Sequence, residues 1–248
     1  MKTAFKRSFA IMALAIVSNV THATDSYNNL VNGAPGLFFQ IANIQPVGQQ
    51  IFLNSFNLAT HPYLTNFTFL YWSPNATFAG GANVQLDIKF IKNNGTPLAT
   101  GWATPGTVFY DTGFFAINTP QADFGPGNVI ENISLNINDG GFNDLYDPNV
   151  VTTPLTLVNL PSTFTIVYTI EGLAGGDTFG VPVYNPPTVG TNYGSYWIDT
   201  GGTWSLLTNS LSPVGFPLQL ETTPEPSVMA MGAVGAVLLA RMLKKKNS

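Results

Sequence analysis

Alternation of apolar and polar side chains is the feature that most restricts the fold of this chain. Apolar residues occupy every second position of residues 84–90, and residues 131–137 and 163–170 alternate in the same way. Because successive side chains of a β-strand point to opposite faces of a sheet, this period predicts strands with one face in the core. Each such strand needs a second apolar layer to cover that face.

The rest of the middle region shows the same pattern in shorter pieces, separated by turns rich in Gly, Asn and Pro. The chain contains 24 Gly and 18 Pro, which argues against long helices. We therefore expect an all-β fold, an antiparallel β-sandwich of jelly-roll-like form. The shorter strands are expected at residues 37–41, 51–58, 67–72, 108–111, 114–117, 155–158, 179–184, 195–198 and 204–207.

The first 23 residues have the three parts of a secretory signal. Lys2, Lys6 and Arg7 precede an apolar run at residues 8–17, and small residues lead up to Ala23. We expect the Sec machinery to export the chain and signal peptidase to cleave after Ala23. The alternative is a membrane anchor, but about ten apolar residues are too few to cross a bilayer.

The last 26 residues, 223–248, form a second apolar segment. Residues 228–240 carry no charge, and Arg241 and the lysines at 244–246 follow them. An apolar helix that ends in cations places that end on the cytoplasmic side of the inner membrane. Residues 228–243 are therefore predicted to form a short transmembrane helix, flanking a β body at residues 24–222. The alternative is an ordinary C-terminal membrane anchor.

This tail resembles the PEP-CTERM sorting signal of bacteria, in which Pro224-Glu225-Pro226 precedes the apolar helix and the basic end. The resemblance implies recognition by exosortase, a membrane protease-transpeptidase that removes the helix. It also implies transient anchoring in the inner membrane, followed by a place at the cell surface or outside the cell.

The body carries a looser resemblance. It is similar to choice-of-anchor type β-sandwich domains of bacterial surface proteins. The similar segments are Asp87-Ile88-Lys89-Phe90, the turn at residues 93–95, residues 105–113 and the later pair Tyr196-Trp197. That resemblance implies a fold and a location, and it implies no activity.

Charge excludes one class of partner. The formal net charge is −4, but only Lys89 and Lys92 of the nine cations lie in the body, against twelve of the thirteen carboxylates. The body is therefore near −10 and repels phosphate backbones, so no nucleic-acid binding is expected. The chain has no cysteine, which excludes disulfides and thiolate chemistry.

Two candidate binding sites remain. Asp139, Asp144 and Asp147 lie in an oxygen-rich segment that suits calcium, although a polar turn would have the same composition. Tyr196, Trp197 and Trp204 surround Gly201-Gly202, so a late hairpin could stack aromatic rings on exopolysaccharide. Packing of these rings in the core is the alternative. Apart from calcium we expect no cofactor.

Motifs for catalysis are missing from the sequence. His61 is the one histidine of the body, it precedes Pro62 in an expected loop, and no Gly-x-Ser-x-Gly elbow occurs. We therefore expect a non-catalytic cell-surface or extracellular-matrix protein. A carbohydrate-binding module is the first alternative. A glycan-processing enzyme is the second, because twelve carboxylates offer many pairs, among which sequence cannot choose.

Overall fold

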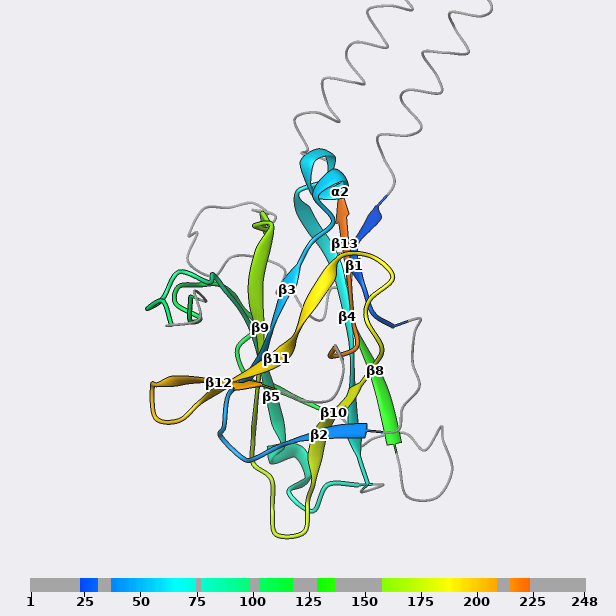
Figure 1. Ribbon diagram of the computed structural model, residues 1–248. Coiled ribbons are helices and arrows are strands. Elements are labelled where there is room, and N and C mark those ends of the chain that lie inside the picture. The colour runs from blue at the N-terminus through cyan, green and yellow to red at the C-terminus, as the bar shows by residue number, and fades with distance from the viewer. Residues whose placement is uncertain are drawn as a thin grey trace, which may run out of the picture.

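The computed structural model describes residues 23–30, 37–74, 77–98, 103–117, 129–136, 158–208 and 215–223. Most of them lie in two antiparallel sheets packed face to face, which confirms the all-β sandwich (Figure 1).

The first sheet is built around one long strand. Residues Tyr63–Phe69 of this strand pair with one neighbour, and residues Asn66–Ser73 pair with another on the opposite edge. In order, the strands are β1 (Thr24–Asn28), β13 (Leu218–Thr223), β4 (Tyr63–Ser73), β10 (Phe179–Val183) and β2 (Leu37–Ile41), with β8 (Val129–Asn136) also on β4.

The second sheet contains most of the clearly alternating segments. Residues 85–91 pair along their whole length with residues 165–171, with Ile88 opposite Tyr168. In order, the strands are β12 (Trp204–Thr208), β11 (Thr191–Asp199), β3 (Val47–Phe52), β9 (Thr163–Glu171), β5 (Gln85–Ile91) and β6 (Val108–Asp111), with β7 (Phe115–Ala116) also on β5.

Aromatic rings join the two sheets. Phe67 of β4 meets Phe90 of β5 with ring centroids 5.4 Å apart, and Phe69 of β4 meets Tyr168 of β9 at 5.7 Å. All four side chains are buried. Because a large ring buries 150–250 Å², such pairs account for a large share of the apolar area removed from water on folding.

One expected strand is wrong. Residues 51–58 do not form a single strand, because β3 ends at Phe52 and the short helix α2 (Ser55–Thr60) follows. The Asn54 side-chain oxygen accepts the backbone N–H groups of Phe56 and Asn57, each at 3.1 Å, so this residue begins the helix as its N-cap. A second short helix, η1 (Gly81–Asn83), precedes β5.

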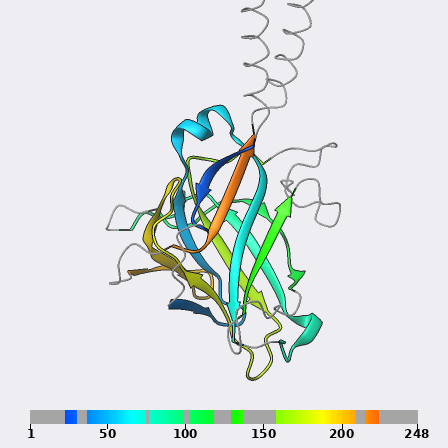
Figure 2. The ribbon, with the colours of Figure 1, turned by 90° about the vertical axis from the view of Figure 1, so that its right-hand side faces the viewer.

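The strands at the two ends of the body are absent from our sequence-based prediction. β1 and β13 lie side by side, with Thr24 opposite Thr222 and Asp25 opposite Glu221. Their outer ends and α2 lie at the same end of the sandwich, which is the upper end in Figure 1 and Figure 2. We call this the tail-side end, because the chain continues into residues 224–248 from Thr223.

Residues 1–22 of the predicted signal segment 1–23, and the whole predicted tail helix at residues 228–243, lie outside the described residues. Within the described ranges, no helix has the length and apolar character needed to cross a membrane.

Candidate functional site

The late hairpin exists, and its register decides which side chains share a face. In β11 and β12, Trp197 lies opposite Leu206 and Asp199 opposite Trp204. Because opposed residues of an antiparallel pair point to the same side, Trp197 and Trp204 lie on one face and Tyr196 on the other. The Asp199 carboxylate accepts the Gly202 N–H at 2.7 Å and closes the turn.

Two of the three predicted glycan contacts are buried, which corrects that prediction. Tyr196 is 3% exposed and stacks on Phe216 in the core, with centroids 4.9 Å apart. Trp197 is fully buried, opposite Gly48 of β3. A ring without free surface cannot stack on a sugar, so these two residues belong to the packing. Trp204 is half-buried and keeps some accessible surface.

The other tryptophans give a mixed picture. Trp72 is half-buried and stacks on Phe38 with centroids 4.3 Å apart and an angle of 19° between the rings. Trp102 lies outside the described residues. The stacked pair shows how a half-buried aromatic ring already has an apolar partner within the protein, which reduces the gain from stacking on a ligand.

The predicted calcium ligands Asp139, Asp144 and Asp147 also lie outside the described residues. In the part of the chain that the structure describes, no three His, Cys, Asp or Glu side chains gather in a way that could hold a metal ion.

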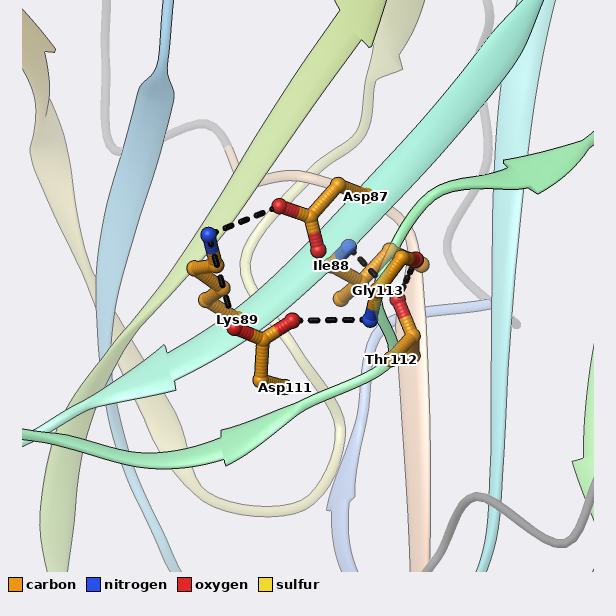
Figure 3. A network of polar contacts seen from close by, with 6 residues as sticks. All are labelled: Asp87, Ile88, Lys89, Asp111, Thr112 and Gly113. Carbon is orange, nitrogen blue, oxygen red and sulfur yellow. Dashed lines mark hydrogen bonds and ion pairs between the residues drawn. The ribbon is translucent and has the colours of Figure 1, made fainter. Parts of the chain in front are cut away.

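A charged cluster on the second sheet was not singled out as a site from the sequence. Lys89 of β5 lies opposite Asp111 of β6, and its Nζ is 3.4 Å from that carboxylate (Figure 3). The same Nζ is 2.9 Å from the Asp87 carboxylate, two residues earlier on β5. Since residues i and i+2 of a strand share a face, the alternating pattern of residues 84–90 could have located the contact between Asp87 and Lys89.

Burial sets the electrostatics of this cluster. The Asp87 side chain is 2% exposed, and its Oδ1 has no hydrogen-bond partner. Burial raises the pKa of Asp87, against the lowering effect of the hydrogen bond from Lys89. For Lys89, burial lowers the pKa, but Asp87 and Asp111 outweigh it and hold the pKa above its ordinary value.

The cluster is suited to structure rather than to sugar hydrolysis. A glycosidase places two carboxylates on opposite sides of a bond, with room for the sugar between them. Here one ammonium group holds both carboxylates, and Asp87 is closed to solvent. Asp111 also accepts the Gly113 N–H at 2.7 Å, which fixes the turn after β6 (Figure 3).

His61 lies directly after α2, where its backbone N–H donates to the Asn57 carbonyl at 2.7 Å. Burial lowers the pKa of its imidazole. His61 therefore lies in the connection between α2 and β4, as we expected of a loop residue, and its N–H closes the last turn of the helix.

The tail-side end brings the beginning of β1 next to the end of β13. Ala23, the predicted cleavage residue, is exposed and precedes β1, while Pro224, Glu225 and Pro226 follow β13 directly and lie outside the described residues. The Ser26 and Thr222 hydroxyl groups, both buried, share a hydrogen bond of 2.5 Å across this strand pair. Ala23 therefore lies next to the strand that precedes the predicted sorting tripeptide.

Comparison with models of known protein families, with curated proteins and with solved structures found no match. The class that the fold itself defines is an antiparallel two-sheet β-sandwich.

Proposed function

We propose that this protein is an exported, non-catalytic cell-surface or extracellular-matrix protein that is sorted through its tail. In this proposal the body is a jelly-roll-like sandwich, and the sequence places it between a removable signal helix and a hydrophobic C-terminal helix. The pairing of β1 with β13 is the observation that best supports it. Both processing segments leave from one end of the body, so signal peptidase and exosortase could each act at the membrane without unfolding the sandwich.

Fractionation of cells tests this function. We expect the full chain to be found at the cell surface or in the medium, with its N-terminus at Thr24 by mass spectrometry. A chain that lacks residues 224–248 should keep its fold, because β13 ends at Thr223, but its fractionation should change. Replacing Pro224-Glu225-Pro226 by three alanines is the matched control, since it keeps the apolar helix. Unchanged surface localisation in both variants would contradict the proposal.

Glycan binding is a second candidate, favoured by Trp204, which keeps accessible surface beside the tight Asp199–Gly202 turn. The whole body, screened on a glycan array, should bind exopolysaccharide-type glycans and lose that binding in Trp204→Ala. The control is Ser205→Ala, because Ser205 is exposed and lies on the other face of β12. Equal binding by Trp204→Ala and the parent protein would remove this candidate.

A further inference from the structure

Phe56 is a large apolar side chain in an unusual place. It lies in α2, and 77% of its surface is exposed. A helix of six residues is not stable by itself, so contacts must hold it. The Asn57 side chain donates to the Asp25 carbonyl at 2.6 Å, and the Asn54 N–H donates to the Ser26 carbonyl at 2.9 Å. The side chain of Phe56 is therefore exposed on a helix that hydrogen bonds hold against β1.

The same contacts place Phe56 beside the exit of the chain. Asp25 lies opposite Glu221, and Thr24 opposite Thr222, in the paired strands β1 and β13. The helix also contacts β13 directly. Figure 2 shows α2 next to the outer ends of these two strands.

The distance from this end to the apolar tail is short. Only residues 224–227 separate Thr223 from Val228, the first residue of the uncharged run. An extended chain covers 3.3–3.6 Å per residue, so Val228 lies at most about 18 Å from Thr223. If residues 228–243 cross the membrane, the tail-side end is held close to the bilayer surface.

From this arrangement we infer that the tail-side end docks on the lipid bilayer and that Phe56 inserts into its interfacial region. An aromatic ring gains from burial among acyl chains and headgroups, as other interfacial aromatic residues do. The inference rests on the proposed function, because the tail supplies the tether.

The nearby charges specify the lipid. Asp25 and Glu221 lie at the same end, and the body as a whole carries twelve carboxylates against the two lysines Lys89 and Lys92. Anionic headgroups would be repelled by Asp25 and Glu221, so the contact should form on zwitterionic phosphatidylcholine and should not strengthen when anionic lipid is added.

Spin labels can test the contact on the full chain in phosphatidylcholine vesicles. The sequence has no cysteine, so one introduced cysteine gives one label. Ser55→Cys places a nitroxide next to Phe56, at an exposed position. Ala42→Cys is the matched control. Ala42 is exposed and lies near Ile44, shortly before β3 begins, whereas α2 follows the other end of β3. The measurement is collision with a water-soluble nickel chelate relative to oxygen.

We expect the Ser55 label to be shielded from the chelate and the Ala42 label to be open to it. Phe56→Asp, and the milder Phe56→Ser, should remove the shielding while the chain still floats with vesicles. Ile44→Asp should leave it unchanged, although Ile44 is also 68% exposed. Shielding that is absent, or that survives both Phe56 variants, overturns the inference. A chain that does not float with vesicles overturns the membrane tail and thereby the proposed function.

Discussion

Asp87 combines a charge, near-complete burial and an oxygen without a hydrogen-bond partner. The carboxylate is tolerated in the sheet because Lys89 lies 2.9 Å away, next to it on the same face. A buried charge that loses its partner costs several kcal/mol, and partial access to water reduces that cost. The stability of the second sheet at this point therefore depends on one lysine.

Lys89→Met should lower the free energy of unfolding by about 1–3 kcal/mol, because it leaves Asp87 and Asp111 without an opposite charge. Urea unfolding followed by tryptophan fluorescence measures the change. Lys92→Met is the matched control, since Lys92 is exposed, and its effect should stay within about 0.5 kcal/mol. Equal losses in the two variants would show that the pair contributes no specific stabilisation.

The raised pKa of Asp87 determines in which direction this residue makes the stability change with pH. Its folded pKa is above its ordinary value of 3.8, so between these two values the folded state holds a proton that the unfolded state has lost. The contribution of Asp87 to stability should therefore rise as the pH falls through the folded pKa.

Asp87→Asn replaces the titrating carboxyl group by an amide that does not titrate. In this variant Lys89 keeps the Asp111 carboxylate, 3.4 Å away, as its partner. The stability of the parent relative to the variant should increase as the pH is lowered towards 3.8, and the variant should be at least as stable as the parent at neutral pH. Denaturant titrations at a series of pH values measure both. A stability difference that is independent of pH would show that the Asp87 pKa is not raised.

At the scale of elements, close backbone contacts determine where the connections can lie. The loop after β9 passes so near to η1 that a Cβ on Gly172 would lie 1.9 Å from the Asn83 carbonyl oxygen, and Gly172 has a positive φ of 77°. The Asp177 carboxylate joins the same two loops by accepting the N–H groups of Ala79, Gly80 and Ala174. These hydrogen bonds lower the pKa of Asp177 below its ordinary value, although burial acts to raise it.

Gly172→Ala should destabilise the protein by more than about 2 kcal/mol, because the new methyl group meets backbone and the left-handed conformation becomes strained. Gly175 lies in the same connection with open space around its Cβ position, so Gly175→Ala is the matched control and should change stability by less than about 1 kcal/mol. Thermal unfolding of both variants gives the comparison. A similar melting temperature for the two would contradict the close approach of these loops.

At the scale of the whole molecule, β1 and β13 close the first sheet by joining segments almost two hundred residues apart. Tyr27 of β1 is fully buried in the core, and the Ser26–Thr222 hydrogen bond is separated by 196 positions in sequence. Cleavage after Ala23 would leave β1 intact, beginning at Thr24. The predicted processing site and the fold are therefore compatible.

A chain of residues 24–223 should fold cooperatively, because both closing strands are present. A chain of residues 29–223 lacks β1 and exposes the pairing edge of β13, and the loss of Tyr27 alone should cost about 3–5 kcal/mol. Circular dichroism and urea titration distinguish the two chains. If the shorter chain were as stable as the longer one, the pairing of the two ends would not be part of the fold.

The sequence by itself determined the type of structure. The alternating residues of β5 and β9, the turns of Gly, Asn and Pro, and the absence of an extended helical period predicted an antiparallel sandwich, because side-chain period is a local property of the chain. The bounds of β2 and β6 agree with the expected segments. The sorting signals at both ends are also local patterns, and they remain predictions.

Only the tertiary structure decided which side chains are accessible. Tyr196, Trp197 and Trp204 look alike in sequence, but the core and Gly48 bury the first two, and only Trp204 keeps free surface. The same holds for α2, which interrupts a strand-like segment because Asn54 caps it and β1 holds it in place. Burial and the pairing of β1 with β13 arise from contacts between distant segments, so no local pattern could reveal them.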